Sequence, residues 1–416
     1  MNPAVAFVFA TVFLDMLGFG IVAPVLPKLV LSFTGQDAAR AAAIFGVFGT
    51  VFALMQFVCS PLLGVLSDRF GRRPVIVLSN FGLGLDFVLM ALAPTLGWLF
   101  AGRVIAGITS ASTTTASAYI ADVAPPEERA AGFGVLGAAF GLGFILGPAI
   151  GGLLGSVNPR LPFWSAAALG LLNAGYGMRV LPESLPRERR RPIDWRRANP
   201  FGAMALLLSH RELFGLSAVA FLSVLAGAVL PSIYVLYVSH RYGWDDRALG
   251  ISLTAVGVCS AIVQAALVKP AVRWLGERGA MLAGLIGGAV GMAIFGTATT
   301  GVLFAIGMPI MALWGLAPAA AQGIMTRRVG VPEQGELQGA LASLASLASL
   351  GGPVLFTLTY ARSIGAGAWN VPGAAWLLSM LMLLAAAVLA LRVTRHAGVT
   401  SRVPAGRIPV AEFSDS

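Results

Sequence analysis

Residues 64–74 read Gly-Val-Leu-Ser-Asp-Arg-Phe-Gly-Arg-Arg-Pro and lie between two long apolar segments. A tight turn needs glycines such as Gly64 and Gly71, because only glycine enters positive φ without strain. The three arginines of this stretch cannot rest in hydrocarbon, so they mark an aqueous face. Asp68 can pair with an arginine or cap the positive end of a nearby helix. An ordinary basic loop explains the arginines, but it does not explain the spacing of the glycines and the aspartate.

The composition excludes an ordinary soluble protein. The 416 residues are 57% hydrophobic and 11% charged, whereas soluble chains carry about 25% charge. We expect a lipid bilayer to be the solvent, because each membrane span needs about 20 apolar residues. The net charge of +10 does not indicate a nucleic-acid partner, because the basic residues are scattered between apolar spans. Cys59 and Cys259 both fall inside apolar segments, which predicts two single buried thiols and no disulfide.

We predict an all-α membrane protein with twelve transmembrane helices in two pseudo-symmetric six-helix bundles. The expected spans, in chain order, are residues 4–29, 41–66, 75–93, 98–121, 131–155, 162–181, 214–238, 249–272, 279–298, 302–325, 337–362 and 373–392. The first bundle then covers residues 1–181 and the second covers residues 213–392. Residues 182–212 are expected to form a solvated linker without a specific partner, and residues 393–416 a polar tail.

The two halves of the chain repeat three landmarks at a nearly constant offset. The repeated pairs are Gly71-Arg72-Arg73 with Gly276-Glu277-Arg278, Gly147-Pro148 with Gly352-Pro353, and Pro126-Glu127 with Pro332-Glu333. One offset that fits three landmarks indicates a duplication. Two parallel repeats about an axis along the membrane normal are a known transporter plan.

The basic residues predict the orientation of the chain. With both termini in the cytoplasm, the cytoplasmic segments hold 21 of the 28 Lys and Arg residues, the outer loops hold six, and Arg103 lies within a span. Basic residues concentrate in cytoplasmic loops of membrane proteins. We therefore expect an even number of spans, with both termini and the linker in the cytoplasm.

Charged groups inside a span are costly and are functional candidates by default. Asp15, Asp86 and Arg103 lie within the first, third and fourth spans, and the second half offers no clear intramembrane charge. An acid whose environment changes between two states can take up and release a proton. We interpret these three residues as a proton site in which either acid titrates and Arg103 is a switchable partner. A static buried pair that only fixes helix packing is the alternative.

Four polar or aromatic residues inside spans are candidates for contact with a small molecule: Gln56, Gln264, Trp314 and Gln322. A mostly apolar cleft with a few polar groups suits an amphipathic compound, although each of these residues could instead serve helix packing. The sequence does not indicate an enzyme, a cofactor or a metal. It has no His/Cys cluster, no nucleophile elbow and no phosphate-binding loop, and its three histidines lie at or beyond span ends.

The fifth span contains the stretch Gly-Phe-Ile-Leu-Gly-Pro-Ala-Ile-Gly-Gly over residues 143–152. Glycines four apart let helix backbones approach closely, and proline permits a bend. The motif residues are Gly143, Gly147, Pro148, Gly151 and Gly152. This order of residues resembles the motif of the antiporter branch of the major facilitator superfamily, and residues 64–74 resemble the loop between the second and third helices of that superfamily.

With residues 14–27, 102–109, 118–122, 249–253 and 335–339, these motifs resemble the tetracycline-resistance exporters of Gram-negative bacteria. The resemblance implies the major facilitator fold, a location in the bacterial inner membrane, a monomer, and exchange of a drug for protons, with a metal-chelated tetracycline as a candidate substrate. It also implies that Asp15, Asp86 and Arg103 match essential charged positions. It further implies a cytoplasmic gate made of Gly64, Asp68, Arg69, Gly71, Arg72, Arg73, Asp122 and Arg129. We expect Asp68 to approach the start of the eleventh span near Leu337.

The sequence departs from these exporters in its second half. They carry an acid in the ninth span and a histidine in the eighth, where this chain has Gly288 and Ser260. Tetracycline itself is therefore less secure as the substrate than drug export in general. A metabolite symporter or facilitator of the same fold is an alternative that the antiporter-like motif disfavours, and a non-transporting membrane sensor is a weaker one.

Overall fold

The structure, a computed structural model, describes residues 3–110, 112–123, 129–190, 211–329, 334–365 and 370–395. These ranges contain helices and no strands. The helices of the first half are α1 (Pro3–Val22), α2 (Leu26–Phe33), α3 (Ala38–Phe70), α4 (Arg72–Leu92), α5 (Leu96–Thr109), α6 (Ser112–Val123), α7 (Arg129–Val157) and α8 (Leu161–Arg179). Those of the second half are α10 (Arg211–Gly227), α11 (Val229–Tyr242), α12 (Asp246–Ile262), α13 (Val268–Thr297), α14 (Gly301–Ala312), α15 (Leu316–Thr326), α16 (Gln334–Ile364) and α17 (Ala374–Arg395).

The helices reproduce the expected spans, and several spans are broken in the middle. The pairs α1–α2, α5–α6, α10–α11 and α14–α15 each correspond to one expected span. In the described chain, nine helical stretches are long and apolar enough to cross a membrane. One of them, Asp246–Thr297, is 52 residues long, which is enough for two crossings of about 20 residues each. It includes a π-helical turn, Val263–Leu267, and turns at Gly276.

The two glycines that the sequence pairs by duplication both turn the chain between helices. Gly71 has φ 108° and Gly276 has φ 70°. Side chains with a Cβ rarely adopt these values, so glycine is required at both points. The repeat is therefore visible in the backbone, with Gly71 between the second and third spans and Gly276 between the eighth and ninth.

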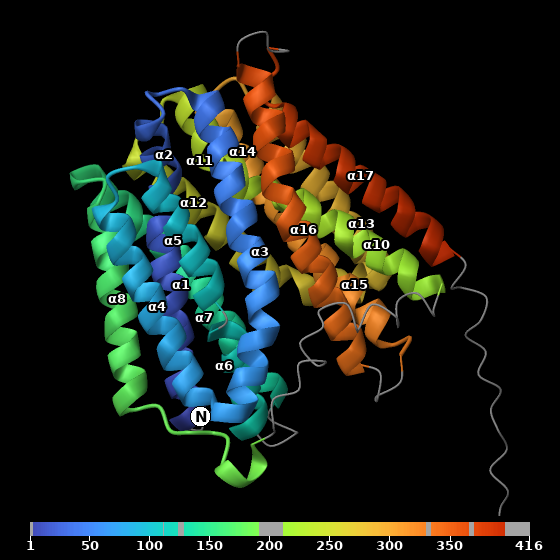
Figure 1. The fold of residues 1–416 in the computed structure, drawn as a ribbon. Coiled ribbons are helices and arrows are strands. Elements are labelled where there is room, and N and C mark those ends of the chain that lie inside the picture. Colours follow the sequence, from blue (N-terminus) through green and yellow to red (C-terminus); the bar gives the residue numbers. More distant parts are fainter. Residues whose placement is uncertain are drawn as a thin grey trace, which may run out of the picture.

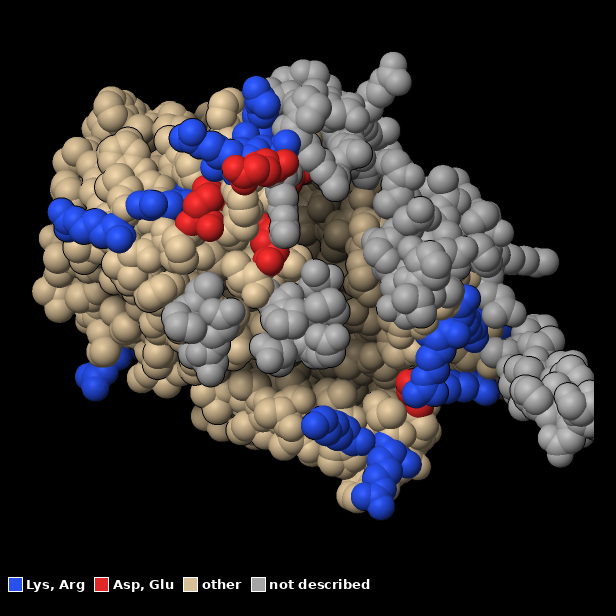
Figure 2. Space-filling model, turned by 90° about the horizontal axis from the view of Figure 1, so that it is seen from below, with Lys and Arg blue, Asp and Glu red and all other residues tan. Residues whose placement is uncertain are grey.

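The two halves form two helical bundles that meet at one end and separate at the other (Figure 1). We name the basic face as the end of the molecule with Gly71, Asp122, Arg179, Gly276 and Arg327, and the closed face as the opposite end with Thr34, Val157, Gly243 and Ala298. In Figure 1 the closed face is at the top. Seen from the basic face, Figure 2 shows a hollow between the halves, with Lys and Arg side chains around it.

Two helix pairs form the main contacts between the described parts of the two halves. Helix α3 packs against α16, where Thr50 Oγ1 donates a hydrogen bond to the Leu350 carbonyl oxygen at 3.2 Å. Helix α7 packs against α12, where Thr254 Oγ1 donates to the Ile145 carbonyl oxygen at 3.1 Å. Both contacts lie toward the closed face, so the hollow opens at the basic face.

The glycine motif of the fifth span lies at two helix contacts of α7. A side chain at Gly143, Gly147 or Gly151 would strike α1, and one at Gly152 would strike the backbone of Gly250 in α12. The close approach expected of these small residues is therefore present. Pro148 stands inside α7 between the two contacts.

Many large apolar side chains point outward, as a bilayer requires. Leu78, Leu172 and Val302 are each about two-thirds or more exposed, at 66%, 69% and 72%. The two cysteines are free, as expected, and half-buried rather than fully buried. Residues 191–210 of the linker and 396–416 of the tail lie outside the described part of the chain.

Candidate functional site

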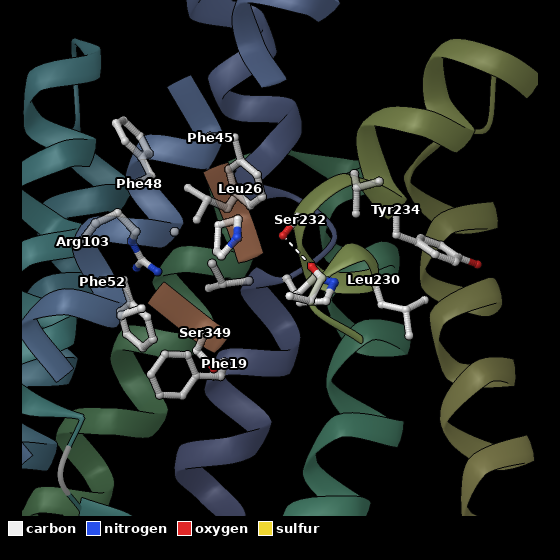
Figure 3. Close-up of a pocket in the computed structure, with 18 of the residues that line it drawn as sticks. Phe19, Leu26, Phe45, Phe48, Phe52, Arg103, Leu230, Ser232, Tyr234 and Ser349 are labelled. Atoms are coloured by element: carbon white, nitrogen blue, oxygen red, sulfur yellow. Dashed lines mark hydrogen bonds between the residues drawn. The ribbon is translucent and has the colours of Figure 1, made fainter. Parts of the chain in front are cut away.

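A central cavity of about 530 Å³ lies between the two halves (Figure 3). The first half supplies an aromatic wall of Phe19, Phe45, Phe48, Phe52 and Phe87. The second half supplies mainly small and aliphatic side chains from α10, α11, α12 and α16, including Leu230, Pro231, Ser232, Leu253 and Ser349. A mostly apolar cavity with few polar groups is suited to an amphipathic small molecule.

A second cavity of about 480 Å³ continues from the central one toward the basic face. Ala53, Gln56 and Ser349 line both, so the two cavities adjoin each other. Several hydroxyl side chains line the extension: Ser60, Thr114, Ser343 and Ser346. The two cavities together form a passage from the basic face to the middle of the molecule.

Among the described residues that line the central cavity, Arg103 is the only charged one. Its Nη2 lies 3.3 Å from Asp86 Oδ2 and 3.1 Å from the sulfur of Met90, and its guanidinium carbon lies 5.8 Å from the centre of the Phe52 ring. Asp86 is fully buried, and Arg103 is 8% exposed. The bonding of the pair is incomplete, because Asp86 Oδ1 and Arg103 Nε have no hydrogen-bond partner among the described residues. A buried ion pair with unsatisfied atoms is costly, and it could be disturbed by a proton or a ligand.

Asp15 lies in a separate buried cluster of amides. Asn173 Nδ2 donates to Asp15 Oδ1 at 2.9 Å and also to the Thr11 carbonyl oxygen. With its amide oriented to satisfy both neighbours, Asn80 donates to Asp15 Oδ2 at 3.0 Å and accepts from Asn173. Helix α1 contributes Thr11 and Asp15 to this cluster, and α4 and α8 contribute one asparagine each.

The structure therefore brings Arg103 to Asp86 and surrounds Asp15 with amides. The buried charged residues of the described chain all lie in the first half: Asp15, Arg72, Asp86 and Arg103. The uneven distribution of charge between the halves that the sequence predicts is confirmed for these residues. Asn80 and Asn173 were missed because they are uncharged, although an amide inside an apolar span is itself a visible signal.

Arg72 is the centre of an ionic network at the basic face. Its Nη1 contacts Asp68 Oδ1 and donates to Ser67 Oγ, both at 2.6 Å, and its Nε contacts Asp122 Oδ2 at 3.1 Å. The backbone N–H of Arg72 donates to Glu183 Oε1 at 2.8 Å. Arg72 is 9% exposed, so this network joins α3, α4, α6 and the start of the linker.

The expectation that the linker has no specific partner is wrong for its first residues. Glu183 accepts from Arg72 and also pairs with Arg190 at 3.7 Å, while Ser184 donates to Asp122 at 3.1 Å. The charged composition of the linker suggested full solvation, but the turn after α8 brings its first residues back to the loop after α3. The linker therefore docks on the first half over residues 182–190.

The remaining residues of the expected gate have diverse surroundings. Arg73 donates to the carbonyl oxygens of Gly177 and Met178 at the end of α8, and Arg69 is exposed. The expectation that Gly64 makes a tight turn is wrong, because Gly64 lies inside the helix α3 and has no positive φ. A Cβ at Gly64 would meet no described atom within 4 Å. Arg129 begins α7, but its side chain lies outside the described part of the structure. Asp68 pairs with Arg72 inside its own half, and its expected approach to Leu337 stays a prediction.

Of the four residues expected to contact a small molecule, two line a cavity and two do not. Gln56 lines the central cavity, and Gln322 lines a different pocket inside the second half. Trp314 donates to Ser223 Oγ at 2.8 Å and packs against Gly227 and Gly288. Gln264 lies in the π-helical turn and, like Trp314, lines none of the three cavities described. Helix packing accounts for Trp314.

A salt bridge between the halves lies at the closed face and was not predicted from the sequence. Lys28 Nζ is 2.6 Å from Asp246 Oδ1 and 3.3 Å from the carbonyl oxygen of Trp244. Lys28 lies in α2, and Asp246 begins α12. Both side chains are only about one-fifth exposed, at 23% and 18%. The pair joins the two halves at the end where the hollow is sealed.

Comparison with known proteins shows close relatives. The sequence matches the Major Facilitator Superfamily over residues 8–316. It is 39% identical over 383 residues to the class C tetracycline resistance protein of Escherichia coli, which covers 92% of this chain and 95% of that protein. It is 36% identical over 377 residues to the class G protein of Vibrio anguillarum, covering 89% and 93%. Among solved structures, the nucleoside transporter NupG matches the fold with a TM-score of 0.76 at 14% identity, covering 95% of this chain and 100% of that chain.

Proposed function

Because this chain belongs to the Major Facilitator Superfamily, and is similar over most of its length to tetracycline resistance proteins, we propose that it exports an amphipathic drug-like molecule in exchange for protons. The observation that carries the proposal is the central cavity, which is open toward one face and has the Asp86–Arg103 pair in its wall. A tetracycline, free or as a metal chelate, is the leading candidate substrate. The ninth span has Gly288 where the tetracycline exporters carry an acid. Other amphipathic drugs are therefore also candidate substrates.

The exchange follows from competition for the ionised Asp86–Arg103 pair. When Asp86 is ionised, it holds the guanidinium at the wall of the cavity, where the guanidinium can contact a substrate. When Asp86 takes up a proton, the ion pair is lost, Arg103 is no longer held in this position, and the substrate is released. Loss of the proton restores the ion pair and with it the substrate site. A proton and a substrate are thus bound in alternation, which is what antiport requires. Asp15 is the other candidate carrier.

The direct test is growth of a susceptible bacterial strain that expresses the chain, across a panel of tetracyclines and unrelated amphipathic drugs. We expect a raised inhibitory concentration for at least one compound, and proton movement when that compound is added to energised everted vesicles. Downhill flux that does not depend on the proton gradient would favour the alternative of a facilitator. A complete lack of flux would favour the alternative of a non-transporting membrane sensor.

We further propose that the basic face is cytoplasmic, with both termini and the linker on that side of a bacterial inner membrane. The support is the charge distribution, because basic loops remain in the cytoplasm. A tag on either terminus is expected to be inaccessible from outside intact cells and accessible after permeabilisation. Labelling of intact cells from outside would contradict this orientation.

The ionic network at the basic face is proposed as the gate on that side. Asp68→Asn is expected to slow transport about fivefold, because the contact to Arg72 is partly exposed and worth about 1 kcal/mol. Glu183→Gln is expected to act in the same direction. Substrate affinity should stay within about twofold of the wild-type value, since neither residue lines the central cavity. Equilibrium binding and vesicle transport measure the two effects separately, and lost binding with a normal transport cycle would exclude the gate role.

The Lys28–Asp246 salt bridge is proposed to hold the closed face shut. Lys28→Met is expected to shift the population about fivefold toward states open at the closed face, because a partly exposed pair contributes up to about 1 kcal/mol. Spin-label distances across the closed face would report the shift. Exchanging the two charges, with Lys28→Asp and Asp246→Lys, should restore the original distribution. An unchanged distribution in Lys28→Met would show that the pair is not a lock.

A further inference from the structure

The second half contains a pocket of about 320 Å³ that the proposed transport cycle does not use. It lies between α10, α15 and α16 and is backed by α13. Its walls include six buried apolar side chains: Val219, Met281, Leu285, Ala317, Ala321 and Met325. An apolar space of this size is a potential site for an apolar ligand, as empty protein cavities with apolar walls can bind such molecules.

The pocket lies next to the route between the halves. Val224 lines both this pocket and the central cavity, and Ala342 and Ala345 line both it and the passage toward the basic face. The pocket therefore adjoins the passage and is separated from it at these positions by small side chains, two of them alanines. This position next to the passage favours a ligand that enters between the halves.

The chemistry of the pocket differs from that of the central cavity. In the part of the chain that the structure describes, no charged side chain lines it, whereas Arg103 lines the central cavity. Its polar end is an amide pair, in which Gln322 Nε2 donates to Gln338 Oε1 at 3.4 Å. Each amide oxygen can accept a further hydrogen bond. The third polar residue, Ser223, accepts from Trp314. The two methionines are flexible and polarisable, so they suit ligands of varied shape.

We propose that this pocket is a second substrate site, which takes an uncharged aromatic amphiphile by its apolar rings and binds a donor group at the Gln322–Gln338 pair. The inference rests on the proposed function, because it makes the pocket a site that the exported substrate occupies before it reaches the central cavity. It predicts that two molecules of a small uncharged compound bind to one chain.

The test uses the uncharged fluorescent amine N-phenylnaphthylamine, titrated against the full chain in nanodiscs, with empty nanodiscs as the blank. We expect two binding classes in the wild type. Ala321→Trp fills the pocket and should remove one class, whereas Ser349→Trp narrows the central cavity and should remove the other. Ala319→Trp is the matched control, because Ala319 is exposed on the same helix and lines none of the cavities.

Gln322→Leu tests the same pocket without filling it. Loss of one hydrogen bond should weaken the second class about fivefold and leave the central class unchanged. A single class in the wild type, as an acyl chain in the pocket would cause, overturns the inference. So does an Ala321→Trp variant that folds and still binds two molecules. Vesicle export measured in parallel separates the two proposals: two classes without any export contradict the proposed function, and export with one class contradicts only the second site.

Discussion

Asp86→Asn is expected to reduce uphill drug export to the level of cells without the protein. Asparagine cannot carry a proton, so the exchange loses its driving ion. The substitution also leaves the Arg103 guanidinium buried beside a neutral group, and removal of one partner from a buried pair costs about 3 kcal/mol or more. We therefore expect two effects together, a loss of coupling and a fall of several degrees in the melting temperature of the purified protein.

A double variant separates these effects. Asp86→Asn combined with Arg103→Gln removes both charges, so it should recover most of the lost melting temperature while export stays absent. If the pair only fixed helix packing, recovery of stability would bring recovery of export. Export in everted vesicles under an imposed pH gradient measures the first effect, and thermal unfolding in detergent measures the second.

Asp15→Asn provides the comparison that decides between the two acids. Asparagine can still accept a hydrogen bond from Asn173, so the amide cluster keeps part of its bonding. We expect this variant to retain measurable proton release on addition of drug. If Asp15→Asn abolishes proton release and Asp86→Asn does not, Asp15 is the carrier. If both variants keep uphill export, the coupling site lies elsewhere.

The sequence predicts how deep a residue lies in the membrane more readily than which neighbouring helix its side chain faces. The apolar lengths predict the spans, and the glycine pair at 71 and 276 predicts where the chain turns in each half. Asp15, Asp86 and Arg103 are all visible as charges inside spans. Their pairing depends on the rotation and packing of α1, α4, α5 and α8, which local periodicity does not provide. The choice of Asp86 over Asp15 as the partner of Arg103 therefore needs the structure.

Contacts between residues that are far apart in the chain also cannot be predicted from the sequence alone. Glu183 belongs to a polar stretch that looks solvated, and its contact with Arg72 exists because the chain turns back after α8. Lys28 and Asp246 are far apart in the chain and meet only because the halves are sealed at the closed face. The central cavity has the same origin, since its walls come from both halves. A sequence motif can identify one residue of such a contact, but it does not identify the partner residue.

Gly147→Val is expected to abolish transport by preventing correct packing of α7 on α1. A Cβ at Gly147 would lie under 3.0 Å from backbone atoms of Gly20 and Ile21. Backbone atoms cannot rotate away as a flexible side chain can, so the helices must separate. Overpacking usually costs about 1–3 kcal/mol, and a clash between two helix backbones is expected to exceed that range. The amount of folded protein, measured by fluorescence-detected size exclusion, should fall sharply.

Gly141→Val, on the same helix, is expected to fail in a different way. A Cβ at Gly141 meets nothing within 4 Å in this structure, so the variant should fold with a nearly normal yield. Ile145, which contacts α12 through Thr254, lies one helical turn further along the same face of α7. Closing the basic face would bring the next turns of this face, with Gly141, toward the second half. We therefore expect normal folding, impaired transport and a population trapped open at the basic face, measured by spin-label distances across that face. Normal transport in Gly141→Val would show that α7 and α12 do not close together along this face.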